Sequence, residues 1–305
     1  MQLLIYLLAY PLLWIISILP FPIFYKVSDA VYGLVYYIIG YRKKMVLSNL
    51  ERCFPEKSEE ELLLIRKKFY KHMCDLFLEM IKSLTMSQTE MKKRAKFNNV
   101  ELLDKYAEQN RSVVLLCGHY ANYEWVLSLG QHIKHDGFGI YSPLSNKYFD
   151  KLIKKTRKRQ GGTLISKFNT AKTIVKNYRA NHLSLYGFVN DQSPQVSHTR
   201  YWRPFFGTVV PVHTAAETLA KKFDLAIVFF CVKKVKRGFY ETTIIDVTDN
   251  PKAYSDYEIT DIYTEMLEKE IRNKPEYYLW THNRFKHRNK VPKESGKDNI
   301  KVKYS

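Results

Sequence analysis

His119 and Glu124 are the two residues whose types and spacing best fit catalysis in this sequence. A neutral imidazole can take a proton from a hydroxyl, and a carboxylate can hold its second ring N–H and stabilise the imidazolium that forms. Five residues of regular helix turn about 500°, so the two side chains would diverge on one helix. They meet only if His119 lies on a turn, which Gly118 permits, and Glu124 on the helix that follows. The spacing alone also allows a structural histidine bonded to a nearby carboxylate.

The elements around this pair predict an α/β fold. The apolar run 112–117 reads as a buried strand, and His119 follows it directly. Ligands of open α/β sheets bind beyond the carboxyl ends of strands, which is where His119 would lie. The start of a helix nearby would help to hold an oxyanion. Further strands are predicted at 138–141, 183–189, 226–232 and 241–247, and helices at 58–84, 146–159, 171–178, 212–223 and, from a cap at Ser255, to about 273.

The segment Gly118-His119-Tyr120-Ala121-Asn122-Tyr123-Glu124-Trp125 resembles the His-x-x-x-x-Asp/Glu motif of acyltransferases that esterify glycerolipids and lipid A. Its Gly-His-x-x-Asn-x-Glu form is similar to the lipid A biosynthesis (late) acyltransferase family of Gram-negative bacteria. Four more blocks resemble that family in the same order, so the resemblance runs from about residue 40 to 287. They are Met45 to Pro55, Tyr141-Ser142-Pro143 with Asn146 and Arg157, Asn190-Asp191-Gln192 with Pro204-Phe205-Phe206-Gly207, and Trp280 to Lys286.

The resemblance implies a glycerolipid-acyltransferase-like central sheet flanked by helices, with His119 and Glu124 as the catalytic pair. It also implies a set of substrate-binding residues, of which Arg157 matches the family's functional arginine and Asp191 an acidic residue of the site. The predicted substrate-binding residues are Arg157, Arg159, Asp191 and Asn122. Ser142 departs from the pattern, because a basic residue is common at that position.

The implied reaction is acyl transfer from an acyl-carrier-protein thioester, or acyl-CoA, to a hydroxyl of a Kdo-bearing lipid A precursor. The hydroxyl would attack the thioester directly, without a cofactor, a metal or a covalent enzyme intermediate. A lysophospholipid or another lipid is the alternative acceptor. A non-catalytic lipid-binding scaffold of the same fold is a further alternative.

The charge of the chain fits these partners. Lys and Arg number 49 against 30 Asp and Glu, which gives a net charge of +19 and an attractive field for polyanions. Acyl carrier protein and phosphorylated lipid A are both acidic. A nucleic-acid-binding protein is the main rival that is not an enzyme. We do not expect nucleic acid as a partner, because the basic residues are scattered along predicted helices and no RRM, KH or zinc pattern occurs.

The first 25 residues carry no charge and predict a membrane anchor over 1–25, either a spanning helix or a half-inserted one. A buried core helix and a signal peptide are the alternatives. If the segment spans, the basic cluster at residues 42–44 places the rest of the chain at the cytoplasmic face of the inner membrane. We expect a helical, membrane-proximal lead-in over 26–95, a catalytic domain over 96–288 and a basic, disordered tail over 289–305.

The four cysteines form no zinc or disulfide pattern and read as reduced thiols. Cys117 lies two residues before His119, so a Cys–His acyl-enzyme is conceivable, although an apolar strand disfavours a thiolate. A metal site at His132, His135 and Asp136 has no supporting frame, and a loop is the preferred interpretation.

Overall fold

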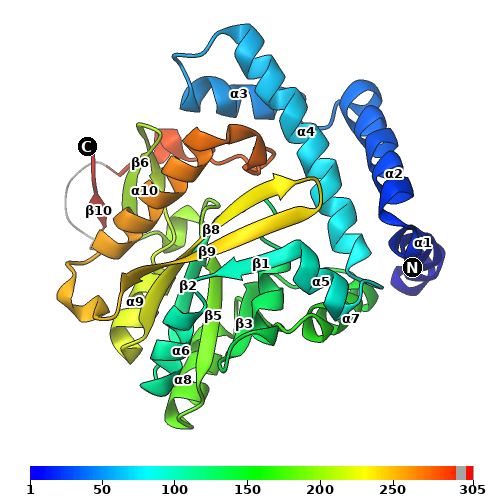
Figure 1. Ribbon diagram of the computed structural model, residues 1–305. Coiled ribbons are helices and arrows are strands. Elements are labelled where there is room, and N and C mark those ends of the chain that lie inside the picture. Colours follow the sequence, from blue (N-terminus) through cyan, green and yellow to red (C-terminus); the bar gives the residue numbers. More distant parts are fainter. Residues whose placement is uncertain (293–299, 305) are drawn as a thin grey trace.

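The apolar run before Gly118 forms β2 (Val113–Cys117), and all five of its residues are buried. The computed structural model describes residues 1–292 and 300–304. In it β2 is the central strand of a seven-stranded sheet with the order β1-β9-β8-β2-β5-β3-β4 (Figure 1). Neighbouring strands are parallel except for the β8–β9 hairpin. The carboxyl ends of β2, β5, β3 and β4 therefore meet at one edge of the sheet.

The other strands of this sheet are mostly short. They are β1 (Ala95–Asn98), β3 (Asp136–Tyr141), β4 (Thr163–Ser166), β5 (Ser184–Val189), β8 (Ala226–Lys236) and β9 (Phe239–Thr248). All five strands expected from the sequence are confirmed. β1 and β4 were not predicted, because each has four residues and neither is a continuous apolar run.

Helices cover both faces of the sheet, so its central strands are buried on both sides. On one side lie α4 (Glu59–Lys82), α5 (Gln88–Arg94) and α7 (Lys147–Arg159), and on the other lie α8 (Thr170–Arg179), α9 (Ala215–Phe223) and α10 (Glu258–Asn273) (Figure 1). A capping box of Ser58 and Glu61 begins α4, at the start of the helix predicted over 58–84. Shorter helices are α3 (Lys43–Cys53) and α6 (Glu101–Glu108). The expected α/β class is confirmed.

The N-terminal segment does not form the expected single helix. Pro20 and Pro22 divide it into α1 (Gln2–Ile18) and α2 (Phe21–Gly33), and a π-helical turn, η1 (Leu34–Ile39), follows. Within residues 1–292 and 300–304, we find no helix that combines the length and the apolar character needed to cross a bilayer. The expectation of a spanning helix is therefore not supported.

The basic tail predicted over 289–305 includes a short strand among its described residues. Residues 293–299 and 305 lie outside the described residues. Lys301–Val302 form β10, which pairs with Tyr201 and Trp202 of β6 (Tyr201–Phe205). With β7 (Thr208–Pro211) they make a second sheet in the order β10-β6-β7. Backbone pairing to an existing strand orders these residues although they are weakly apolar.

Candidate active site

His119 lies just beyond the carboxyl end of β2, as the sequence predicts. Gly118 separates it from the strand, but its role is not to form a left-handed turn. A Cβ at Gly118 would come within 2.5 Å of the Leu267 side chain of α10, so Leu267 would have to shift to admit a side chain there. The left-handed residue of the segment is Ala121, with φ of 47°. This turn decides where the next side chains point.

Asp191 is the carboxylate that holds His119. The Nδ1 of His119 lies 2.7 Å from Asp191 Oδ1, and the backbone N–H of His119 donates to the same oxygen at 3.1 Å. Asp191 is the second residue after β5, and β5 pairs with β2, so the topology brings together residues 72 positions apart. An ionised carboxylate can only accept hydrogen bonds, so Nδ1 carries the proton and Nε2 of the neutral ring is free to accept one.

The two groups shift each other's pKa in opposite directions. Burial acts to lower the pKa of His119, but the charge and hydrogen bond of Asp191, aided by the charge of Glu124, raise it above its usual value. Burial acts to raise the pKa of Asp191, but the charge and hydrogen bonds of His119 hold it below its usual range. Asp191 is thus a carboxylate poised to stabilise an imidazolium.

Glu124 does not accept the imidazole N–H, which corrects the pairing expected from the sequence. Its carboxylate instead accepts a hydrogen bond from Arg157 of α7. The reason is local: in the described residues that directly follow His119, the first helix is the 3-10 segment η2 (Trp125–Gln131), which begins after Glu124. The turn at Ala121 therefore sends Glu124 toward α7. The expected help from a regular helix N-terminus is also absent from the described residues next to His119.

Asn122 and Arg159 form hydrogen bonds within the protein and do not line a ligand cavity. Asn122 is buried, donates to Glu79 at 2.7 Å, and accepts the N–H of Trp125 at 3.1 Å. Arg159 donates to the carbonyl oxygens of Ser83 and Leu84, each at 2.6 Å. The structure thus brings His119 to Asp191 and Glu124 to Arg157, and it leaves Asn122 and Arg159 outside the lining of the cavity.

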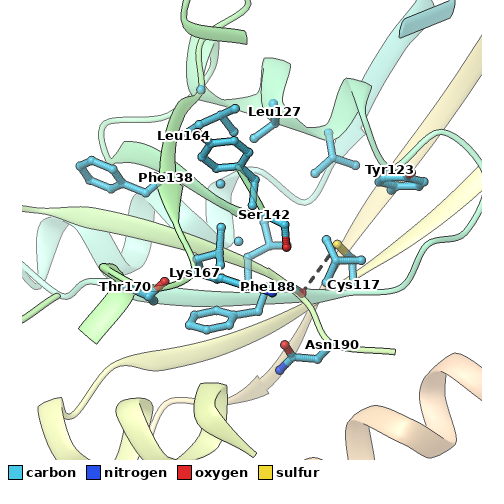
Figure 2. Close-up of a pocket in the computed structure, with 18 of the residues that line it drawn as sticks. Cys117, Tyr123, Leu127, Phe138, Ser142, Leu164, Lys167, Thr170, Phe188 and Asn190 are labelled. Carbon is cyan, nitrogen blue, oxygen red and sulfur yellow. Dashed lines mark hydrogen bonds between the residues drawn. The ribbon is translucent and has the colours of Figure 1, made fainter. Parts of the chain in front are cut away.

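His119, Glu124 and Arg157 line a cavity of about 950 Å³. Its walls come from both sides of the sheet, because Leu127 of η2 lines it together with Ala171 of α8. Figure 2 shows Leu127 and Leu164 at one end and Thr170 and Asn190 at the other, with Ser142 between them. The cavity therefore bends around the carboxyl edge of the sheet, and most of its lining is apolar.

Glycines leave room for part of this cavity. Gly139 of β3 and Gly187 of β5 pair across the sheet, and both line the cavity. A Cβ at Gly187 would meet nothing closer than the Phe138 carbonyl oxygen at 3.7 Å. A Cβ at Gly139 would meet the Leu127 side chain at 2.9 Å. The sheet therefore leaves space for a ligand beside Gly187, whereas the missing side chain of Gly139 makes room for Leu127.

Two alternative chemistries do not fit the geometry. The thiol of Cys117 is 3.9 Å from the Phe188 carbonyl oxygen (Figure 2), and burial raises its pKa, so a thiolate nucleophile is disfavoured. His132, His135 and Asp136 do not converge. His135 bonds to the Arg111 carbonyl oxygen, and Asp136 pairs with His182. Among the described residues, no three potential metal ligands lie together.

Two residues near His119 were missed at the level of sequence. The Nε2 atoms of Gln192 and His119 are 3.3 Å apart, and the ring of Tyr123 packs edge-on against the imidazole with centroids 4.8 Å apart. Gln192 adjoins Asp191 after a strand, which is the signal that could have identified it. Asp191 was predicted to bind substrate, whereas the structure makes it the partner of the imidazole.

A histidine held by a buried carboxylate at an apolar cavity defines a site for proton transfer to or from a hydrophobic ligand. Residues 1–287 match the family described as bacterial lipid A biosynthesis acyltransferase. The chain belongs to this family, and it is an acyltransferase.

Three curated relatives cover most of the chain. The chain is 25% identical over 285 residues to the lipid A biosynthesis lauroyltransferase of Escherichia coli K12, which covers 90% of this chain and 89% of the relative. It is 23% identical over 281 residues to the lipid A biosynthesis palmitoleoyltransferase of the same strain, with the same coverage. It is 24% identical over 278 residues to a lipid A biosynthesis acyltransferase of Haemophilus influenzae, covering 88% and 86%.

Proposed function

We propose that this enzyme transfers a fatty acyl chain from an acyl-carrier-protein thioester to a hydroxyl of a lipid A precursor. The observation that carries the proposal is the His119–Asp191 pair at the apolar cavity, in a chain that belongs to the lipid A acyltransferase family. The relatives named above act in lipid A biosynthesis and differ in the acyl chain that their names specify.

In the proposed reaction His119 is the general base. Its unprotonated Nε2 takes the proton of the acceptor hydroxyl while the oxygen attacks the thioester carbonyl. Asp191 holds Nδ1 and stabilises the imidazolium, which then returns the proton to the departing thiolate. No covalent enzyme intermediate forms. Glu124 acts through Arg157, which it orients at the cavity wall, and its negative charge favours the imidazolium.

The shape of the cavity suits a reaction between two acyl chains. The acceptor hydroxyl of a lipid A precursor lies on a 3-hydroxyacyl chain, so this chain and the donor chain must both reach His119. A cavity lined from both faces of the sheet gives each chain a separate apolar wall. Arg157, at the same cavity, is a suitable cation for a phosphate of either substrate.

We further propose that the N-terminal elements lie in the interface of the inner membrane at its cytoplasmic face. Many large apolar side chains of α1, α2 and η1 are exposed, which is unusual for a surface that faces only water. Lys43 and Lys44 follow η1 and suit anionic lipid. α1 also packs on α7, because Tyr6 contacts Tyr148 and Phe149, so the helix that carries Arg157 would lie near the membrane.

Product analysis tests this function directly. The purified chain in detergent micelles is given lauroyl-acyl carrier protein and a tetraacylated, Kdo-bearing lipid A precursor, and the lipid is analysed by mass spectrometry. We expect one added acyl chain. Parallel reactions with acyl-CoA as donor and with a lysophospholipid as acceptor decide between the alternatives. Transfer to the lysophospholipid alone, with an unchanged lipid A precursor, would contradict the proposed acceptor.

A further inference from the structure

The side chain of Gln192 occupies the position that an acceptor hydroxyl needs. Its amide nitrogen lies 3.3 Å from His119 Nε2, the atom that must take the hydroxyl proton in the proposed reaction. Because Nδ1 carries the ring proton, Nε2 accepts here and the Gln192 amide donates. The amide of Gln192 is therefore held next to the reacting atoms with its N–H groups toward them.

The segment that carries Gln192 is fixed from the C-terminal part of the chain. The N–H of Ser193 donates to His282 Nε2 at 3.0 Å, and Ser193 Oγ donates to the Arg284 carbonyl oxygen at 2.7 Å. Burial lowers the pKa of His282 to about 4, which keeps its ring neutral and able to accept. Asn49 holds this C-terminal segment through the carbonyl oxygens of Trp280 and His282. These hydrogen bonds fix the position of Ser193, the residue after Gln192. The Gln192 amide is thereby held beside His119.

The neighbouring donors already have partners within the protein. The backbone N–H of His119 donates to Asp191, and that of Ala121 to the Tyr277 carbonyl oxygen. The N–H of Ser193 is bonded to His282, and Nη2 of the Arg157 guanidinium donates to Glu124. In the described part of the chain, the Gln192 amide is the donor that lies within hydrogen-bond distance of His119 Nε2.

We infer that Gln192 is a catalytic residue that stabilises the oxyanion of the tetrahedral intermediate. The inference rests on the proposed function, because it needs a hydroxyl to replace Gln192 at His119 Nε2. When the acceptor binds, its hydroxyl takes over Nε2 and the amide N–H is free for the thioester carbonyl oxygen beside it.

The two substrates and His119 account for every proton and electron pair that moves in the proposed step. The hydroxyl proton passes to Nε2 as the new C–O bond forms, and the carbonyl π electrons move to the oxygen that Gln192 contacts. Collapse reforms the C=O bond and breaks the C–S bond. The thiolate then takes the proton from the imidazolium, so the products are an ester and a thiol.

Gln192→Leu tests the inference in the assay described above. Loss of one oxyanion donor lowers kcat about 10²- to 10³-fold in enzymes of known mechanism, and we expect a loss in this range with KM changed only a few-fold. Gln192→Asn, which keeps an amide one bond shorter, should retain part of the rate. Gln192→Glu should be the least active, because its carboxylate would oppose the oxyanion.

The controls separate this inference from a structural role and from the proposed function. Gln109→Leu makes the same chemical change at an exposed position and should leave kcat unchanged. The pH at which kcat/KM falls on the acid side should stay the same in Gln192→Leu, since His119 and Asp191 are untouched. A kcat equal to or above wild type in Gln192→Leu would mean that Gln192 only fills the site when no acceptor is bound. That result would overturn the inference. An inactive wild type would instead contradict the proposed function.

Discussion

Two clusters of charged side chains in this protein contain the same kinds of groups but have different roles. At the cavity, Asp191 holds His119 and Glu124 holds Arg157. Between α2, α4 and the β8–β9 hairpin, Arg237 bridges Asp75 at 2.6 Å and Asp29 at 2.7 Å. None of these three residues of the second cluster lines the cavity.

The two clusters differ in whether a ligand can reach a polar atom of one of their members. Asp75 is almost fully buried, and Arg237, Ser28 and Lys234 all point at its carboxylate. Such a cluster ties the N-terminal helix α2 to the hairpin. At the cavity, by contrast, Nε2 of the imidazole contacts the Gln192 amide, which the acceptor hydroxyl displaces in the proposed reaction. A charged pair is useful for catalysis where a ligand in a cavity can reach a polar atom of one partner.

Replacement of His119 should give the largest effect. His119→Ala removes the proposed base, so we expect kcat to fall roughly 10³- to 10⁴-fold. The rates are compared at a temperature at which both proteins are folded, because the buried Asp191 loses its imidazole partner in this variant. The matched control is His182→Ala, which breaks another histidine–aspartate pair, one that is exposed and away from the cavity. Equal losses in both variants would contradict the proposed role of His119.

Asp191→Asn should be the next most harmful change, and it should also alter the pH profile. His119 must be neutral to act as a base, so kcat/KM falls when the pH drops through its raised pKa. Loss of the Asp191 charge lowers that pKa, which moves the acid limb of the profile to lower pH. We expect the maximal rate to fall about 10²- to 10³-fold, because the imidazolium loses its partner and the ring its orientation. An acid limb that stayed in place, or that moved to higher pH, would refute this.

Arg237→Ala should separate the two clusters by affecting stability instead of activity. The change leaves Asp75 buried with only part of its compensation, so the free energy of unfolding should decrease by about 3 kcal/mol. Denaturant titration measures this decrease, with the exposed Arg179→Ala as control. At a temperature where both proteins are folded, kcat should remain close to wild type. A large loss of kcat in folded Arg237→Ala would show that the clusters are not independent.

The coupling of Glu124 and Arg157 should give the smallest effect. A double-mutant cycle on kcat/KM with Glu124→Gln and Arg157→Met should show a coupling of about 1–2 kcal/mol, because each side chain orients the other. Strict additivity would indicate that the two residues act separately, for example with Glu124 working on His119 alone.

The parts of the fold that follow from local pattern could be predicted from the sequence. The run that forms β2 and the capping box at Ser58 are both read from a few neighbouring residues. Short elements escaped this reading, because β4 has only four residues and β10 has two. The pairing of β10 depends on a strand a hundred residues away, and no local signal reports that.

The site residues also divide into those that neighbouring residues predict and those that depend on the pairing of distant strands. The position of His119 after a strand is a local property, and it was predicted correctly. The partner of His119 is not, since Asp191 reaches it only through the pairing of β5 with β2. The expectation for Glu124 assumed a regular helix, and the left-handed Ala121 breaks that assumption. An alanine gives no warning of such a turn, because glycine or asparagine is the usual residue there.

One oxygen of Asp191 accepts from both the main chain and the ring of His119, and this double contact limits the freedom of the imidazole. A single acceptor that binds two points of one residue fixes its backbone and its side-chain rotamer together. The ring therefore has little rotational entropy left to lose when a substrate arrives. Most of the ordering needed for the transition state is already complete when the chain has folded.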